Sequence, residues 1–95
     1  MAAEANTVEM SIYLRSRIPD LLGATPEDAQ RIADAIVQHV GQARLGGPEV
    51  VICRDMYETF VTVPLLSGSK ASCVVYFEIT PEGRRVVKRL TRGKR

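Results

Sequence analysis

Seven basic residues gather near the carboxyl end of this chain, and no acidic residue follows Glu82. They are Arg84, Arg85, Lys88, Arg89, Arg92, Lys94 and Arg95. On a helix, like charges four residues apart are destabilising by roughly 0.2–0.5 kcal/mol per pair, so a cluster of this kind suggests a surface kept for an anion. The phosphates of nucleic acid are the first candidate. The alternatives are a solvated helix face and a site for an acidic protein surface.

Three aromatic residues, Tyr57, Phe60 and Tyr76, precede the basic segment and could stack on unpaired bases. The chain contains only three tyrosines and two phenylalanines, and it has no tryptophan. With so few large rings available, packing in a core or an interface is the alternative role for these three.

Side chains that could support catalysis or bind a metal are few and scattered. The single histidine, His39, could pair with Cys53 or Cys73, but the spacing of the three residues matches no metal or Cys–His motif. Gly46-Gly47 is followed by proline rather than by the Lys-Ser/Thr of a phosphate-binding loop. We therefore expect no catalytic residue, no metal and no cofactor, and hence a non-enzymatic protein.

Length and composition limit the kind of molecule to which these residues belong. With 95 residues, 45% of them hydrophobic and 25% charged, the chain can form one small globular domain. We predict a single domain over residues 1–95, with residues 1–6 and 92–95 disordered. The net charge of +2 is unevenly divided, because residues 51–95 contain nine basic and only four acidic residues.

The cysteines and the apolar runs bear on where the protein is found. Two cysteines are too few for the disulfide framework of a small secreted domain, so both are expected to be buried hydrophobic residues. One disulfide or a thiol site is the alternative. The sequence shows neither a signal peptide nor an apolar run near the ~20 residues of a membrane span. We expect a cytoplasmic protein without membrane contact.

Two helices are predicted in the amino-terminal half. The first spans residues 7–17, because Pro19 disfavours the helical conformation of the residue before it. The second spans residues 25–45 and starts with Thr-Pro-Glu, an N-cap followed by proline and an acid. Its apolar residues, among them Ile32, Ile36 and Val40, fall within an arc of about 140°. This arc is wide for so short a chain, and we expect these three residues to form the interface of a homodimer.

From residue 49 the hydrophobic period changes to that of β-strands. Strands are predicted at residues 50–53, 59–66 and 72–79, and the last two should form a hairpin through a turn at Gly68. Because Pro64 cannot donate a hydrogen bond to a neighbouring strand, its strand is expected at an edge.

The carboxyl-terminal segment is predicted to be helical. Thr-Pro-Glu at residues 80–82 repeats the start signal of the second helix, and Val86, Val87 and Leu90 would form a narrow apolar stripe. The fold class expected is therefore α+β, with two amino-terminal helices, a three-stranded mostly antiparallel sheet and a basic carboxyl-terminal helix.

Two short segments resemble families of transcription regulators. Residues 76–84 (Tyr-Phe-Glu-Ile-Thr-Pro-Glu-Gly-Arg) resemble the closing wing strand and following helix of winged-helix regulators. Residues 29–55, a helix leading through a Gly-Gly pair to Val-Val-Ile-Cys-Arg, resemble the dimerisation segment of Mor-type phage transcription activators. Both resemblances imply regulation linked to DNA. They imply different architectures, and neither family's DNA-recognition helix has a counterpart here, so no family is assigned.

Together these patterns predict a small non-enzymatic regulatory protein. It would bind nucleic acid through the basic carboxyl-terminal helix and tail, as a homodimer. The alternative is a compact protein-interaction module or inhibitor, of the viral or mobile-element type, that acts on another protein.

Overall fold

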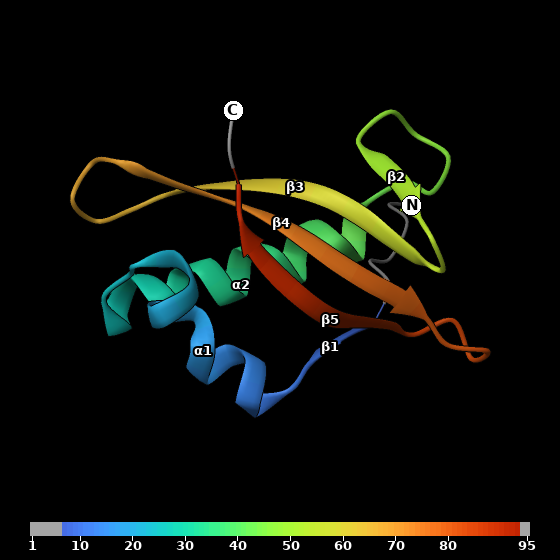
Figure 1. Cartoon of the computed structure of the whole chain (residues 1–95), viewed down its shortest axis with the longest axis horizontal. Helices are drawn as coiled ribbons and strands as arrows, with labels where there is room; N and C mark the ends of the chain where they lie inside the picture. The colour runs from blue at the N-terminus through green and yellow to red at the C-terminus, as the bar shows by residue number, and fades with distance from the viewer. Residues whose placement is uncertain (1–6, 94–95) are drawn as a thin grey trace, which may run out of the picture.

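Residues 7–93 form two helices and a five-stranded mixed sheet (Figure 1). The computed structural model describes residues 7–93. In chain order the elements are β1 (Val8–Met10), α1 (Ile12–Leu22), α2 (Pro26–Gln42), β2 (Val50–Cys53), β3 (Met56–Pro64), β4 (Lys70–Ile79) and β5 (Arg85–Arg92). The α+β class is confirmed. The predicted three-stranded sheet with a basic carboxyl-terminal helix is wrong.

The sheet has the strand order β1-β5-β4-β3-β2. β1 runs parallel to β5, and the other neighbouring strands are antiparallel. Both helices lie against the same face of the sheet, and the hydrophobic core fills the space between them and that face (Figure 1). The largest side chains buried there are Phe77, Ile18, Ile32, Ile36, Val40 and Val75.

The carboxyl-terminal segment is a strand rather than the predicted helix. A turn after β4, closed by a 2.8 Å hydrogen bond from the Gly83 N–H to the Thr80 carbonyl, sends the chain back along β4 as β5. Gly83 has a φ of +90°, which a residue with a side chain rarely adopts. Arg92, expected to be disordered, ends β5. The expected disorder of residues 1–6, 94 and 95 concerns positions outside the described residues.

A β-bulge in β5 explains why its sequence resembles that of a helix. Lys88 has no partner on β4, because the pairing passes directly from Arg89 to Val87. The extra residue shifts the alternation of side chains between the two faces of the sheet. As a result, the buried Val87 and Leu90 are three residues apart, a spacing that otherwise indicates one side of a helix.

The amino-terminal region also differs from its prediction. Part of the expected helix at residues 7–17 is the short strand β1, and α1 begins only after Ser11, whose hydroxyl accepts the Leu14 N–H at 3.1 Å. α1 then continues through Pro19 to Leu22. Proline removes one backbone hydrogen bond of the helix, but burial of Ile18 and Leu22 in the core holds the segment in place.

α2 forms as predicted at its start, where the Thr25 hydroxyl accepts the Asp28 N–H at 3.2 Å. Its apolar face has a different role from the one expected. Ile32, Ile36 and Val40 have no exposed surface, because they pack under the sheet of their own chain. The wide apolar arc is thus explained within one copy of the protein, and these three side chains are not accessible to a second copy.

The three predicted strands of the carboxyl-terminal half are present as β2, β3 and β4. β3 and β4 form the expected hairpin, in which Pro64 pairs with Lys70 at the open end. β2 accompanies β3 only as far as Thr59, so the segment that contains Pro64 has no strand on its other side. Proline is tolerated there because no hydrogen bond to a neighbour is lost.

Candidate functional site

The basic residues at the carboxyl end do not form one continuous surface. Arg84, just before β5, forms an ion pair with Glu9 of β1, and about half of each side chain is exposed. An exposed pair of this kind adds little to stability. It does, however, neutralise part of the positive charge within the chain.

Arg85 is buried, with 7% of its surface exposed. Its guanidinium donates hydrogen bonds to the carbonyls of Val40 and Ala43, each at 2.7 Å, and lies 5.9 Å from the centre of the Phe77 ring. Burial lowers the pKa of Arg85. The two carbonyls belong to the carboxyl end of α2, where a positive charge is favourable. The Val40 carbonyl also accepts the Ala43 N–H, at 3.3 Å. Arg85 is therefore part of the core and is not available to an external anion.

Arg92 lies on the side of the sheet that the helices cover. It pairs with the buried Cys73 across the β4–β5 ladder, so its side chain leaves the sheet on the same face. Its guanidinium reaches Gly23 at the end of α1, where a Cβ atom would lie 2.9 Å from the Arg92 Nη2. Lys94 and Arg95 lie outside the described residues.

Lys88 and Arg89 are the remaining two, and both side chains are exposed. Lys88 is the extra residue of the bulge, and Arg89 lies over Tyr76 of β4, with 5.5 Å between its guanidinium carbon and the ring centre. Within residues 7–93, neither side chain forms an ion pair. These two cations can meet an anion from outside.

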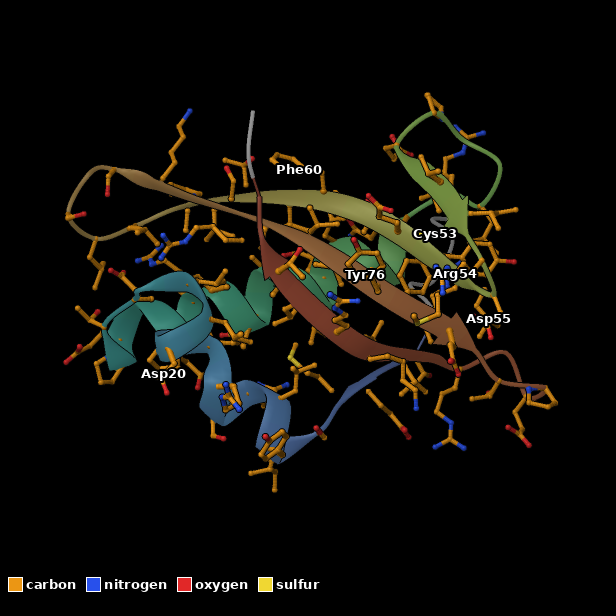
Figure 2. The ribbon with its side chains drawn as sticks, in the orientation of Figure 1. Asp20, Cys53, Arg54, Asp55, Phe60 and Tyr76 are labelled. Atoms are coloured by element: carbon orange, nitrogen blue, oxygen red, sulfur yellow. The ribbon has the colours of Figure 1, made fainter. Side chains whose placement is uncertain are left out.

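Within residues 7–93, no other element covers the face of the sheet opposite the helices, and we call it the open face. Its residues alternate with the buried residues of each strand. On the three inner strands it consists of Glu58, Phe60, Thr62, Pro64, Lys70, Ser72, Val74, Tyr76, Glu78, Val86, Arg89 and Thr91, and most of these are half-buried. Figure 2 shows Phe60 and Tyr76 on neighbouring strands, with α2 behind them.

Two rows of side chains cross the open face. In the first, Arg89, Tyr76 and Glu58 lie opposite one another on β5, β4 and β3. The adjacent row contains Phe60, opposite Val74. Phe60 and Tyr76 are therefore diagonal neighbours, a separation at which two aromatic rings can present one surface.

The third predicted stacking residue, Tyr57, is on the other side of the sheet. Its ring stacks on Phe77 in the core, with 5.6 Å between ring centres and 25° between ring planes. The structure thus brings together two of the three predicted aromatic residues with one of the predicted basic residues. Glu58, which lies on β3 opposite Tyr76, was not among the predicted site residues. The alternation along residues 57–63 could have placed it on the same face as Phe60, but not opposite Tyr76.

The open face carries charged residues of both signs. Lys70, at the start of β4, is exposed, and Glu78 lies near its end. Arg89 and Glu58 lie between them, on either side of Tyr76. The carboxylates of Glu58 and Glu78 form no hydrogen bond or ion pair with any described residue. The open face is therefore amphipathic rather than uniformly basic.

The residues considered for catalysis are separated. His39 Nε2 lies 3.1 Å from the Thr59 hydroxyl, which donates to the Glu49 carbonyl at 3.0 Å. Because the hydroxyl proton is used there, His39 must donate through Nε2. Cys53 and Cys73 are free cysteines, and Cys73 is buried. In the part of the chain that the structure describes, no group of three or more His, Cys, Asp or Glu side chains could hold a metal.

A groove of about 670 Å³ lies between β1, the start of α1 and β5. Its ionisable side chains include Glu9, which pairs with Arg84, and the cations Arg15 and Lys88. Among residues 7–93, no histidine, cysteine or second carboxylate lines it. Ser11 also lines the groove, and its hydroxyl accepts the Leu14 N–H at the start of α1.

Comparisons with known proteins gave no match: no family model, no curated protein and no solved structure is significantly similar to this chain. Neither resemblance to transcription regulators is therefore supported by a family match. The segment expected to be a wing strand and a helix is instead the end of β4 and the turn before β5. Among the described residues, neither helix is long and apolar enough to cross a membrane.

Proposed function

We propose that this is a small regulatory protein that binds single-stranded nucleic acid on the open face of its sheet. The observation that carries the proposal is the pair of rings, Phe60 and Tyr76, on adjacent inner strands with Arg89 stacked on Tyr76. An uncovered antiparallel sheet with aromatic rings on its inner strands is a suitable platform for unpaired bases. Arginine adds a charge for the phosphate and a planar group that also stacks.

A single strand fits this surface better than a duplex does. The major groove of DNA admits a helix or a two-stranded ribbon, and the basic helix that was expected to enter it is absent. A broad sheet instead presents ring faces, which only unstacked bases can contact. With Arg84 paired and Arg85 buried, phosphate attraction is limited to few cations, so base stacking must supply much of the affinity.

The alternative function, a protein-interaction module, is favoured by a separate observation. β2 is an edge strand on which Val51 and Ile52 are 56% and 71% exposed. Unpaired edges of this kind can accept an extended segment of another protein as an additional strand. Binding of a partner at this edge should not change when Tyr76 or Arg89 of the open face is substituted. Such substitutions therefore distinguish the two proposals.

The experiment is a fluorescence anisotropy titration with labelled RNA and DNA single strands and the corresponding duplex. We expect the single strands to bind more tightly. If Lys88 and Arg89 each engage one phosphate, the plot of log K against log salt should have a slope of about −1.4, at −0.7 per phosphate. Tyr76→Leu should weaken binding by about 1–3 kcal/mol, because one stacked base is lost.

The matched pair of charge variants is Arg89→Gln and Arg31→Gln. Arg31 is exposed on α2, on the opposite side of the molecule. Arg89→Gln should reduce the salt slope by about 0.7, whereas Arg31→Gln should leave binding unchanged. Equal losses in the two variants would mean only a general effect of net charge and would contradict the proposal. Removal of residues 84–95 is not a usable test, because it deletes β5 from within the sheet.

A further inference from the structure

Glu58 is an unexpected residue on a surface proposed to bind a polyanion. It is half-buried on β3, between Val51 of β2 and Tyr76 of β4. No described residue forms a hydrogen bond or an ion pair with its carboxylate. A carboxylate repels phosphate but is a strong hydrogen-bond acceptor, so a ligand that lies against it must bring donor groups.

We propose that the row formed by Arg89, Tyr76 and Glu58, here called the recognition row, binds one guanine nucleotide. This inference rests on the proposed function, since it assigns a base to the same face. In the recognition row a cation, an aromatic ring and a carboxylate follow one another on β5, β4 and β3. The order of the three groups sets the direction in which a nucleotide can lie.

The spacing of the strands fits one nucleotide laid across them. Neighbouring strands are about 4.8 Å apart, so the backbones at Arg89 and Glu58 are separated by about 10 Å. The phosphate is attracted to Arg89 and repelled by Glu58, which places the sugar-phosphate chain on the β5 side. The base then lies over Tyr76, and its hydrogen-bonding edge points toward Glu58.

Guanine is the base whose edge suits a carboxylate in that position. Its Watson–Crick edge carries two adjacent donors, the N1–H and the 2-amino group, which can bind both oxygens of one carboxylate. Adenine and cytosine each offer a single amino group beside a ring-nitrogen acceptor, and uracil places its one N–H between two carbonyls. A bidentate contact of this kind is sufficient for about tenfold discrimination between bases.

The test uses a labelled uridine tract with one central guanosine, and the same tract with adenosine or inosine at that position. Inosine lacks the 2-amino group but keeps the N1–H. By fluorescence anisotropy, the guanosine strand should bind about tenfold more tightly than the adenosine strand. The inosine strand should have an intermediate affinity, because one of the two donors is lost.

Two matched variants assign the preference to Glu58. Glu58→Gln keeps the size of the side chain but replaces one acceptor oxygen with a donor, so the preference for guanosine should disappear. Binding of the plain uridine tract should not weaken, because a negative charge has been removed. Glu78→Gln makes the same change on β4 of the open face, outside the recognition row, and should retain the preference. Circular dichroism of both variants verifies that the fold is intact.

The possible outcomes separate this inference from the proposed function. If the strands bind without a base preference, or if Glu58→Gln keeps it, guanine recognition is overturned and strand binding stands. If no strand binds at low salt, both proposals fail. The last measurement compares the binding of free guanosine monophosphate and free adenosine monophosphate with that of the strand. If the guanine nucleotide alone binds as tightly as the strand, guanine recognition is retained but the proposed strand-binding function is overturned.

Discussion

Arg85 and Arg89 are four residues apart on β5, yet their surroundings give them opposite roles. Arg85 is buried against the carboxyl end of α2, where its hydrogen bonds to Val40 and Ala43 satisfy two helix carbonyls. Arg89 is exposed above the Tyr76 ring. A substitution of Arg85 would remove both of these buried hydrogen bonds and would destabilise the fold. Loss of ligand binding in such a variant would therefore carry no information about the open face.

At the scale of single residues, the burial of Cys73 predicts that the free energy of unfolding falls in alkali. Burial raises the pKa of its thiol from 9.0 to about 11 in the folded state. The stability linked to the protonated thiol is thus fully present below pH 9 and is lost as the pH rises through 11, at about 1.4 kcal/mol per pH unit between these values. Urea unfolding at pH 8 and pH 11 should show a smaller alkaline loss in Cys73→Ala than in the unaltered protein.

Cys53→Ala is the control for this measurement. It removes the other free cysteine, which lies half-buried on β2, and should leave the alkaline loss of the unaltered protein in place. An equal alkaline loss in all three proteins would show that groups other than Cys73 cause it.

Among the elements, β3, β4 and β5 approach one another closely at Gly93, which has no side chain. Gly93 follows β5, and its N–H donates to the Ser72 carbonyl of β4 at 2.9 Å. The Phe60 ring of β3 occupies the space beside it, so that a Cβ atom on Gly93 would lie 2.5 Å from the ring atom Cε1. Glycine is required here by close approach, and the contact helps to fix the position of Phe60 on the open face.

This contact predicts that the destabilisation caused by a side chain at residue 93 depends on the presence of the Phe60 ring. Gly93→Ala should destabilise the protein by about 1–3 kcal/mol, the usual range for overpacking, because the Phe60 ring must move. In a Phe60→Ala background the same substitution should cost much less, since the ring is gone. The free energy of unfolding in urea, measured for both single variants and the double variant, gives the coupling. Additive effects would contradict the contact.

In the molecule as a whole, both helices cover one face of the sheet and leave the other open. An antiparallel sheet tolerates this arrangement because its polar and apolar residues alternate between the two faces. The open face is nevertheless not purely polar, since Phe60, Val74, Tyr76 and Val86 lie on it. Apolar surface retained in so small a domain is consistent with a binding role for that face.

The position of α2 bears on whether two copies of the protein associate through this helix. Because Ile36 is completely buried in its own chain, Ile36→Ala should leave a cavity and lower the free energy of unfolding by about 2–5 kcal/mol. The urea midpoint of the variant and of the unaltered protein should not change with protein concentration. A midpoint that rises with concentration in the unaltered protein, but not in Ile36→Ala, would instead support a dimer through this helix face.

The parts of the fold that could be predicted are those with local signals. The N-cap at Thr25 and the apolar spacing after it specify α2, and the alternation over residues 72–79 specifies β4. β1 has no such signal, because its partner is β5, more than 70 residues away in the chain. β5 misleads for a different reason, because its bulge at Lys88 gives the apolar residues a helical spacing.

The order of residues was enough to show that a basic, aromatic-containing carboxyl-terminal half follows an amphipathic helix in one small α+β protein. It was not enough to show which charges remain for a ligand, because that depends on how the strands pair. Strand pairing sent Arg85 into the core and Arg89 to the open face, and it placed Glu58 and Tyr76 side by side. Neighbours in a sheet are set by hydrogen bonds between distant segments, which no local pattern of residues encodes.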